Sequence, residues 1–509
     1  MSPRRDLIVI GGGHNGLAAA IAVARAGRSV LVVERRPEVG GLASGEEFHP
    51  GYRTDGVLLD TAAVRPWVVD ELKLGGHGLV RHTPPPTLVP VRGGAGLVLD
   101  REEVQGVSDR DRGRYGEYRG FLARVAPVLR RWLDRPPPDL LDPGPADLLG
   151  LGLTGFALRR LGRGTMSEVL RVAPTAVADW LGEWFENEGL RAALAAPALW
   201  ASRTGPRAPG TTANLLLGAV TGGEVVAGGP AGLVAALEWA ARAVGIEIRT
   251  GCEVEAIVMS GGAAAGVRLA GGEEIAARRV AASCDPKQVF LRLVPPPARS
   301  RGLTEDVLAY RAHGSSAKVD LALSGYPDFE GRPGERFESI RIGETLEELE
   351  RSADAVKYRR FSERPLLEIR VPTIAAPELA PAGHHVFSIL VHFAAHEIDG
   401  GWSGGARDAL GRVVVDRLNE AAPGVRDLVV GQRVLTPVDL EERFGLTGGH
   451  LYHGEHALDQ LLVRPVPGCA RYETPVKGLF LCGSGSHPGG GLSCAPGTLA
   501  AKTILSSLP

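Results

Sequence analysis

The stretch DLIVIGGGHNGLAAAIAVARAGRSVLVVERR at residues 6–36 constrains the fold of this chain more than any other part of the sequence. Apolar runs at residues 7–10 and 30–33 have the length and continuous hydrophobicity of buried parallel strands. The alanine-rich segment between them predicts a helix over residues 17–26. A strand, a helix and a second parallel strand form the βαβ unit that is typical of dinucleotide-binding domains.

The turn between the first strand and the helix carries a GxGxxG pattern. In this pattern the first glycine makes a tight turn, the second lets the backbone approach a pyrophosphate, and the third lets the helix pack on the strand. A glutamate ends the second strand, where a carboxylate accepts hydrogen bonds from a ribose hydroxyl. The phosphates meet the helix N-terminus, whose partial positive charge favours anions. We therefore expect a dinucleotide to contact Gly11, Gly13, His14, Asn15, Gly16 and Glu34.

The segment after Glu34 favours FAD over NAD as the dinucleotide. The run ERRPEVGGLASG places a second glycine pair shortly after the acid. Such a pair resembles the long FAD signature, in which it brings backbone close to the diphosphate and the flavin. A dehydrogenase that binds only NAD has no need of this pair. The FAD contacts expected in this segment are Arg35, Gly40, Gly41, Leu42 and Ala43.

A second glycine pattern, at Ala227, Gly229 and Gly232, raises the alternative of a separate NADP-binding domain. A helix follows it, and Arg249 ends the next strand, where an arginine can meet the NADP phosphate. The preceding strand has only about three apolar residues, which is short for a central parallel strand. Alanine also replaces the first glycine. We therefore favour the interpretation that residues 223–290 continue the FAD domain, with three short strands joined by Gly-Gly turns.

The closing stretch LFLCGSGSHPGGGLSCAPGTLAA, residues 479–501, is expected to return to the first domain. Its first four residues predict a buried parallel strand, after which Gly483 lets the chain pass close to the diphosphate. The glycines that follow, among them Gly491, and the adjoining Leu492 are expected to bring backbone N–H groups toward the pyrimidine edge of the flavin. A helix that begins near Pro496 would favour the negative charge of reduced flavin.

Five cysteines are scattered along the chain, and no two have CxxC spacing. This argues against a redox disulfide, a zinc site and a secreted scaffold. Cys494 lies in the closing stretch, where two roles are open: a small side chain that fits beside the cofactor, or a covalent link to the flavin. We favour the small packed side chain.

The composition of the chain limits the number of domains and the classes of partner. The chain has 509 residues, too many for one compact core, and its 44% hydrophobic and 23% charged content is ordinary for a globular protein. A net charge of -2 gives no electrostatic footprint for nucleic acid. There is no run of 18 or more apolar residues, and the basic, apolar start of the chain runs directly into the glycine pattern. We expect a cytoplasmic protein with at most peripheral membrane contact; the sequence does not indicate an oligomeric state.

The expected fold class is α/β, a discontinuous Rossmann-type FAD domain with an inserted α+β substrate domain. We assign residues 1–70, 223–290 and 435–509 to the FAD domain and residues 71–222 and 291–434 to the substrate or lid domain. The inserted segments offer few clustered polar groups, so the substrate cavity is expected to be mostly apolar.

An apolar stretch at residues 140–164 ends in Arg159, Arg160 and Arg163. One interpretation is an amphipathic surface element that touches a membrane or admits an apolar substrate. The other is a core helix with a solvated basic end, and this is the interpretation that we favour.

With these motifs in place, the chain resembles the phytoene desaturase-like (carotenoid desaturase- and ketolase-related) FAD-dependent oxidoreductases. Within them it is most similar to the branch called pyridine nucleotide-disulphide oxidoreductase domain-containing protein 2. The resemblance extends in order over nearly the whole chain, and it rests on VIGGGHNGLAAA, PGY followed by an Asp-Gly pair (Gly51, Tyr52, Asp55, Gly56), GTTANLLLGAV, LTPVDLEERFGLTGGHLYHGEHALDQLLVRP and LCGSGSHPGGGLSCAPGTLAA.

The resemblance implies a glutathione-reductase-like FAD-binding fold. It also implies that Val254 contacts the adenine end of FAD through its backbone. The name of the branch suggests a redox disulfide, but without a CxxC pair we reject disulfide chemistry.

The resemblance also places residues 448–462 near the flavin. His453, His456 and Asp459 in this block have a spacing that a metal site can use, but flavin desaturases need no metal and nothing completes the ligand set, so no metal is expected. His453 and His487 are the candidate catalytic residues, as proton acceptors or donors beside the substrate. A purely structural role for His453 is the alternative.

Three functions remain open. The first is an FAD-dependent desaturase or dehydrogenase that moves a hydride between flavin N5 and an apolar polyene, isoprenoid or polyketide-like substrate. In the second, NAD(P)H is a transient electron donor and the hydride goes to the substrate, as in a reductive cyclisation. The third is a non-enzymatic prenyl-binding carrier, similar to the Rab escort and dissociation-inhibitor proteins, which does not use FAD. We favour the first.

Overall fold

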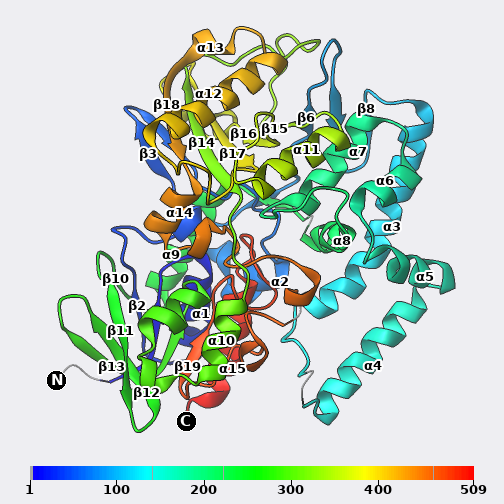
Figure 1. Cartoon of the computed structure of the whole chain (residues 1–509). Helices are drawn as coiled ribbons and strands as arrows, with labels where there is room; N and C mark the ends of the chain where they lie inside the picture. Colours follow the sequence, from blue (N-terminus) through cyan, green and yellow to red (C-terminus); the bar gives the residue numbers. More distant parts are fainter. Residues whose placement is uncertain (1–3, 140–141, 222, 462) are drawn as a thin grey trace.

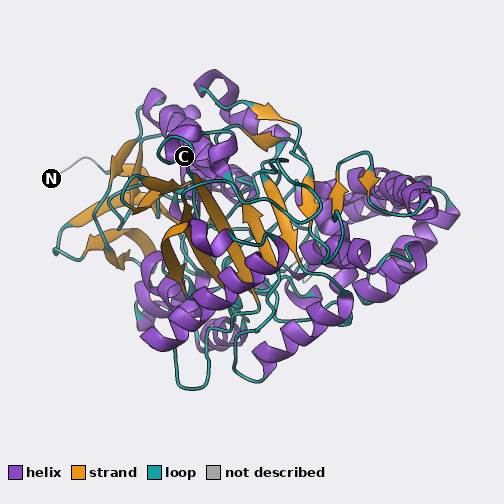
Figure 2. Ribbon diagram, turned by 90° about the horizontal axis from the view of Figure 1, so that it is seen from above, coloured by secondary structure: helices purple, strands orange, loops and turns teal. Residues whose placement is uncertain are grey.

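The structure is a computed structural model of the chain and describes residues 4–139, 142–221, 223–461 and 463–509. Two β-sheets lie one above the other, and a group of helices lies to one side of them (Figure 1). Figure 2 shows the strands of both sheets from above, with helices around them.

The lower sheet contains the βαβ unit predicted from the first residues. The strand β1 (Arg5–Ile10) pairs in parallel with β2 (Val30–Val33) on one side and with β13 (Glu274–Ala282) on the other, and β10 (Glu247–Arg249) extends the sheet beyond β2. The last strand, β19 (Leu479–Leu481), pairs in parallel with β13, so the predicted return of the closing stretch to this sheet is confirmed.

The strand β13 pairs with three strands along its length. Its first residues pair antiparallel with β12 (Ala263–Leu269), which pairs with β11 (Val254–Ser260), and its last residues pair with β1 and β19. These are the three short strands expected between residues 252 and 285.

Both faces of the lower sheet are covered, which explains its continuous apolar strands. Leu7 and Val9 pack with α1 (His14–Arg25), α9 (Gly229–Ala243) and α15 (Ala495–Ser507), whereas Ile8 and Ile10 pack with the meander of β11 and β12. The helices α1 and α15 lie in close contact. At Gly497 they are so close that a Cβ atom would meet the Asn15 carbonyl oxygen at 2.0 Å.

The second glycine pattern does not begin a separate parallel sheet. The strand before it, β9 (Val225–Val226), has two residues and pairs antiparallel with β5 (Arg81–His82). The helix α9 and strand β10 that follow belong to the lower sheet and its cover. The domain boundaries expected from the sequence stay a prediction.

The upper sheet has the strand order β18-β14-β17-β16-β15-β6-β7-β8. Its helix α12 (Gly404–Ala421) packs on the apolar face of β14 and β17. The strands of this sheet are β6 (Thr87–Val89), β7 (Leu97–Leu99), β8 (Val104–Gln105), β14 (Ser316–Leu323), β15 (Ser339–Ile342), β16 (Leu367–Arg370), β17 (His385–His392) and β18 (Val429–Leu435).

Smaller elements connect the two sheets and cover their edges. They include the hairpin of β3 (Glu46–His49) with β4 (Tyr52–Thr54), and the helices α2 (Pro66–Leu72), α10 (Arg301–Ala309), α11 (Leu346–Lys357), α13 (Val425–Leu428) and α14 (Pro437–Phe444).

The helical group at the side is built by residues 109–221. The helices of this group are α3 (Asp109–Leu133), α4 (Pro145–Arg160), α5 (Arg163–Val172), α6 (Val177–Trp184), α7 (Glu188–Ala195) and α8 (Thr211–Thr221). Residues 167–195 have a helical pattern and fold as parts of three helices, α5, α6 and α7.

The core-helix interpretation of residues 140–164 is wrong. The helix α4 buries none of its residues and projects from the side of the molecule (Figure 1). Among the described elements, its main contacts are with its neighbours α3 and α5, and only Leu158, near its end, packs partly buried against the helical core. Most of its other apolar side chains remain exposed. Residues 140 and 141 of that stretch lie outside the described residues.

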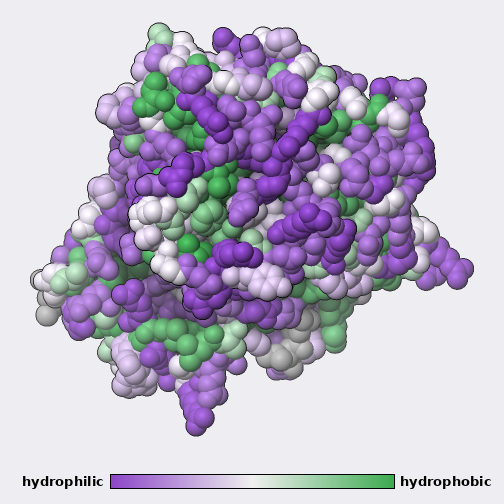
Figure 3. Space-filling model, turned by 45° about the horizontal axis from the view of Figure 1, so that its top comes forward, coloured by the Kyte–Doolittle hydropathy of each residue, from purple (hydrophilic) through white to green (hydrophobic). Residues whose placement is uncertain are grey.

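The molecular surface is otherwise ordinary. The face drawn in Figure 3 is mostly hydrophilic, and its hydrophobic residues lie in separate patches. Within the described ranges, no helix combines the length and the apolar character needed to cross a bilayer.

Candidate functional site

The three glycines of the first turn have different surroundings. Gly11 has φ +96°, and a Cβ on Gly16 would meet the Gly11 carbonyl oxygen at 2.1 Å, so both positions require glycine. A Cβ on Gly13 would meet no atom closer than 4.0 Å. Gly13 therefore faces open space, as expected of the glycine that approaches a pyrophosphate.

The N-terminus of α1 has the properties of an anion site. Its N-cap residue is Gly13, which offers no side-chain cap, and no acidic residue lies in the first turn. The Oδ1 atom of Asn15 is buried without a hydrogen-bond partner. Free N–H groups at a helix start bind phosphate groups well, so the diphosphate of FAD fits this site.

Glu34 is held at the end of β2 with its carboxylate turned toward the glycine turn. Its Oε2 accepts a hydrogen bond of 2.7 Å from the Gly12 N–H, and its Oε1 accepts one of 2.8 Å from the Arg36 N–H. The Cys252 N–H donates to the Glu34 carbonyl at 2.9 Å and so brings the start of β11, at Val254, beside it. Each carboxylate oxygen retains a lone pair for a ribose hydroxyl.

The second glycine pair lies directly against the first turn. The Gly40 N–H donates to the Gly12 carbonyl at 2.8 Å, and Gly40 has φ +109°. Gly41 begins a short 3-10 turn that contains the buried Leu42 and Ala43. The structure thus brings this pair together with the GxGxxG turn.

Arg35 is the exception among the expected contacts. Its side chain is exposed and donates to the Glu442 carbonyl in α14 at 3.0 Å, so the guanidinium lies outside the glycine cradle. Arg36 instead turns inward and donates to the Gly41 carbonyl at 3.1 Å. The two arginines follow each other in the bend after β2, and only the second turns toward the cradle.

The closing loop completes the cradle from the other end of the chain. The Asn15 side-chain amide donates to the Ser484 hydroxyl at 3.0 Å, and the His14 Nε2–H donates to the Gly491 carbonyl at 3.2 Å. Gly483 lies so close to the Ser283 carbonyl oxygen that a Cβ would meet it at 2.3 Å.

The helix that follows the closing loop begins at Ala495, with Pro496 in its first turn, close to the expected start. Leu492 and Cys494 are fully buried, and Cys494 has φ +55° at the N-cap. Burial raises the pKa of the Cys494 thiol to about 12, so it is uncharged at neutral pH. A neutral thiol is a poor nucleophile, which favours the packed side chain over a covalent link.

His487 lies in the closing loop and is fully buried. Its Nε2–H donates to the Trp132 carbonyl at the end of α3 at 2.8 Å, whereas its Nδ1 has no partner. Burial lowers its pKa to about 4, so the ring is neutral at pH 7 with one free acceptor nitrogen.

His453 lies in a tight turn, with φ +56°, and its side chain is half-buried. Its Nδ1 has no partner, and burial lowers its pKa to about 3. The ring is therefore neutral at pH 7 and poorly hydrated, although part of its surface stays exposed.

Tyr452 and His456 lie in the same turn, and the sequence did not predict that they pack on the closing loop. The rings of Tyr452 and His456 lie 5.0 Å apart between centroids, and the Gly490 N–H donates to His456 Nε2 at 3.2 Å. A Cβ on Gly490 would meet the Tyr452 side chain at 2.2 Å. The turn therefore packs directly on the closing loop.

Arg464 holds this turn in place. It is fully buried, and its guanidinium donates to the carbonyls of Gly454 and Glu455 at 3.0 Å and to the Tyr310 hydroxyl at 3.0 Å. Nothing in the local pattern LLVRP distinguishes such an arginine from a surface one.

The three residues weighed as metal ligands do not come together. Asp459 pairs with Arg311 at 2.7 Å, and His456 accepts the bond from Gly490. Over the described ranges, no three His, Cys, Asp or Glu side chains are grouped so as to hold a metal ion.

A sealed charge cluster lies beside the cradle, and we call it the Lys318 cluster. The Lys318 ammonium donates to Asp320 Oδ1 and to the Ser388 hydroxyl, each at 2.5 Å, and Lys318 and Asp320 are fully buried. Arg433 donates to Asp320 Oδ2 at 2.6 Å. Burial opposes ionisation of Asp320, but the charges of Lys318 and Arg433 keep its pKa below the usual value.

Asp55 connects this cluster to the cradle. It is buried, its Oδ1 has no partner, and its Oδ2 lies where a Cβ on Gly229 would come within 2.6 Å. Burial raises its pKa to about 6, and the charge of Lys318 opposes that rise. The Val57 N–H donates to the Leu42 carbonyl at 2.8 Å, which places this segment against the cofactor cradle.

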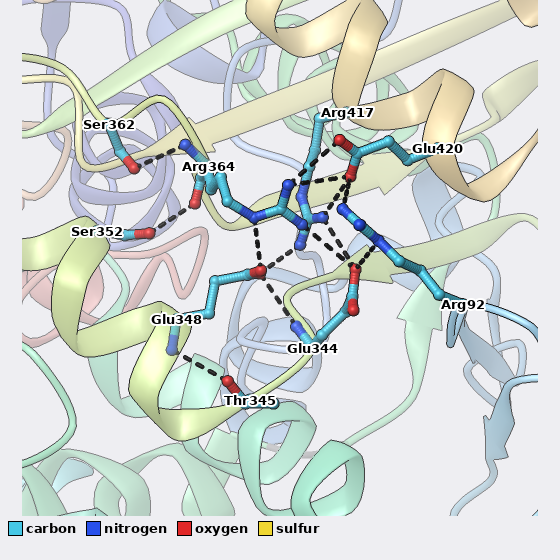
Figure 4. Close-up of polar contacts among 9 residues, drawn as sticks. All are labelled: Arg92, Glu344, Thr345, Glu348, Ser352, Ser362, Arg364, Arg417 and Glu420. Atoms are coloured by element: carbon cyan, nitrogen blue, oxygen red, sulfur yellow. Dashed lines mark hydrogen bonds and ion pairs between the residues drawn. The ribbon is translucent and has the colours of Figure 1, made fainter.

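A second cluster of charge, the Arg417 cluster, lies in the upper part of the molecule between α11 and α12 (Figure 4). Arg417 bonds Glu344 at 2.9 Å and Glu420 at 2.8 Å and also contacts Glu348. Arg364 pairs with the same three carboxylates, and Arg92 pairs with Glu344 and Glu420. Three arginines and three glutamates balance one another, as in an ion-pair network that stabilises the fold.

The two-sheet fold and the glycine cradle define an FAD-dependent oxidoreductase. A family model described as FAD dependent oxidoreductase matches residues 6–55. The pyridine nucleotide-disulfide oxidoreductase domain-containing protein 2 of Rattus norvegicus is 32% identical to this chain, with 100% of the chain and 94% of the relative covered. The chain belongs to the family of that protein.

More distant relatives also match over nearly their whole length. A limonene dehydrogenase polypeptide of Castellaniella defragrans is 27% identical, with 98% of this chain and 94% of the relative covered. The zeta-carotene-forming phytoene desaturase of Myxococcus xanthus is 25% identical, with 96% and 91% covered. The carrier interpretation is set aside, because the chain is an FAD-dependent enzyme.

Solved structures share the fold at low sequence identity. An oxidoreductase from Methanosarcina mazei has a TM-score of 0.59 at 19% identity, covering 98% of this chain and all of the other. Putrescine oxidase bound to putrescine has a TM-score of 0.61 at 14% identity, with 99% of each chain covered. At these identities the likeness shows the fold alone.

Proposed function

We propose that this enzyme dehydrogenates an uncharged, apolar isoprenoid hydrocarbon. The observation that carries the proposal is the uncharged wall formed by Tyr452, His453 and His456 against the closing loop. Burial holds the pKa of both histidines well below neutrality and raises that of the tyrosine, so none of the three is charged at pH 7. The charge of Arg464 is directed to backbone carbonyls behind this wall.

The names of two relatives support the substrate class. Limonene and phytoene, which those names contain, are isoprenoid hydrocarbons without an ionisable group. An uncharged wall suits such a substrate, since a charged wall would have to lose its hydration when the hydrocarbon binds.

The proposed FAD contacts follow the cradle. The N-terminus of α1 holds the diphosphate, Glu34 the ribose, and the start of β11 the adenine end. FAD supplies a hydride acceptor at N5. The residues proposed to hold it are Gly11, Gly13, His14, Asn15, Gly16, Glu34, Gly40, Gly41, Leu42, Ala43, Val254, Gly483, Gly491 and Leu492, with Arg35 contributing backbone alone.

Each of the two histidines has an unpartnered Nδ1 that is available for proton movement. Nδ1 of His487 and Nδ1 of His453 lack partners, and both rings are neutral at pH 7. A neutral imidazole in a dry site can accept the proton that leaves the carbon next to the hydride donor. His487 is also bonded to Trp132, which keeps its Nδ1 in a fixed direction.

Anaerobic stopped-flow mixing tests the direction of the reaction. We expect limonene or phytoene to bleach the flavin absorbance of the purified holoenzyme, and NADPH to leave it unchanged on the same timescale. Rapid bleaching by NADPH with no reaction of the hydrocarbons would support the reductive alternative, in which the reduced flavin delivers a hydride to the substrate.

The substitution His487→Ala tests the assignment of the proton acceptor. We expect turnover to fall about 10²-fold or more while the flavin content, measured by absorbance, stays the same. Unchanged kinetics would remove His487 from the site.

A further inference from the structure

The helix α4 is the most unusual surface feature of the molecule. Among its side chains, Leu148, Leu149, Leu153 and Phe156 are 57%, 65%, 47% and 58% exposed. Contiguous apolar surface of this kind on a globular protein marks an interaction site. At 3.6 residues per turn these four positions lie within a sector of about 140°, and Leu151, 38% exposed, lies just outside this sector beside Leu148. The partly buried Thr154, Ala157 and Leu158 lie on the other side of the helix.

Positive charge borders this apolar side. Arg159 and Arg160 end α4, and Arg163 begins α5. All three are exposed, and in the described part of the chain neither Arg159 nor Arg163 forms an ion pair, while Arg160 lies over the Phe156 ring at 5.8 Å. An exposed apolar face with unpaired arginines at its edge is the pattern of a helix that lies in a membrane interface.

We propose that α4 docks this enzyme on anionic phospholipid, with the four apolar side chains among the acyl chains and the three arginines at the headgroups. A second copy of the chain fits the charge less well. A symmetric dimer places the same patch on both partners, so six arginines would face one another, whereas anionic headgroups neutralise them.

The position of α4 indicates a role for this lipid contact in substrate entry. This role rests on the proposed function. The α4 residue Asp147 pairs with Arg471, shortly before the closing strand, at 3.2 Å. The preceding helix α3 ends at Trp132 and Leu133, where the Trp132 carbonyl receives the hydrogen bond from His487. The docking helix is therefore attached to the loop beside the candidate site, and a hydrocarbon dissolved in the bilayer would enter there without crossing water.

Co-sedimentation of the holoenzyme with lipid vesicles tests docking without any substrate. We expect binding to vesicles of 70% phosphatidylcholine and 30% phosphatidylglycerol (approximate molar shares) that weakens with salt, and about tenfold weaker binding to phosphatidylcholine alone. The variant L149E/F156E should lose at least about tenfold in partitioning. The control L308E/V430E, which changes two exposed apolar residues on other elements, should bind like the unaltered protein.

A second pair of variants separates charge from apolar burial. R159Q/R163Q should lose the preference for anionic lipid, and R25Q/R412Q, which removes two exposed arginines elsewhere, should keep it. Equal vesicle binding by L149E/F156E and the unaltered protein, or no vesicle binding at all, would overturn the proposal. So would a dimer in analytical ultracentrifugation that L149E/F156E converts to monomer. Because no substrate is present, none of these outcomes depends on the proposed reaction.

Discussion

The Lys318 cluster and the Arg417 cluster both place charges inside the upper half of the protein, but they differ in their access to water. In the Lys318 cluster the ammonium and the Asp320 carboxylate are both 0% exposed. In the Arg417 cluster the central guanidinium is 2% exposed, but its partners Glu344 and Glu420 are 23% and 37% exposed (Figure 4).

This difference decides what each cluster costs. Charges that keep one side in water lose little hydration, so their mutual attraction is a modest gain. A sealed pair loses the hydration of both partners and is often no more stable than an apolar pair of the same size. The Lys318 cluster is therefore not explained by stability alone, and its distinguishing property is its position beside the cofactor cradle through Asp55.

The substitution Lys318→Met should have the largest effect on stability. It leaves the buried Asp320 with Arg433 as its remaining cation, and breaking a buried pair costs about 3–5 kcal/mol of unfolding free energy. Urea denaturation followed by circular dichroism measures this loss. The paired replacement K318M/D320L should restore most of it; a loss below about 1 kcal/mol for Lys318→Met would show that the cluster is not sealed.

Asp55→Asn should change how stability depends on pH. Because burial raises the folded-state pKa from 3.8 to about 6, Asp55 takes up a proton on folding between these pH values. Its contribution to the free energy of unfolding therefore falls as pH rises through this range, and the loss is complete above about pH 6. The unfolding free energy of the variant minus that of the unaltered protein should therefore rise by up to about 3 kcal/mol from pH 4 to pH 6 and then stay level.

The difference between the two proteins is the quantity to measure, because it cancels contributions that they share. Histidines with lowered pKa values, such as His453 and His487, act in the opposite direction over the same range. A difference that does not vary with pH would mean that Asp55 is ionised normally in the folded protein.

Arg417→Met should cost less than Lys318→Met. It removes the guanidinium that joins Glu344, Glu348 and Glu420, but water and the arginines Arg92 and Arg364 still reach these carboxylates. We expect a loss of about 1–3 kcal/mol in the same urea experiment. A loss as large as that of Lys318→Met would remove the contrast between the two clusters.

Arg364→Met should have the smallest effect. The Arg364 side chain is 38% exposed, and Arg417 continues to bond the same three glutamates. Exposed ion pairs of this kind contribute about 0–1 kcal/mol. The loss should shrink further at high salt, which screens exposed pairs but not sealed ones.

The parts of the fold that were predicted from sequence are those with local patterns. The βαβ unit, the three-stranded meander and the closing strand each follow from apolar runs separated by glycine turns, and the structure contains all of them. The approach of His14 and Asn15 to the closing loop followed in turn from the return of that strand.

The parts that were not predicted depend on distant or missing partners. The Lys318 cluster joins residues of β14, β17 and β18 to Asp55, and none of these segments contains a local sign of the others. The exposure of α4 was missed for a different reason. An apolar helix pattern indicates that burial of the helix is favourable. It does not indicate whether the chain has a surface on which the helix can pack.

The position of β13 between the first strand and the last has a consequence for the newly made protein. The strand β1 is complete at Ile10, but its sheet lacks β19 until Leu481 has been added. The strand β13 is complete at Ala282, 199 residues before Leu481. At ribosomal speeds of about 5–20 residues per second, one edge of β13 therefore stays unpaired for roughly 10 to 40 s. An unpaired strand edge can pair with other chains, so the growing chain needs protection by chaperones during this interval.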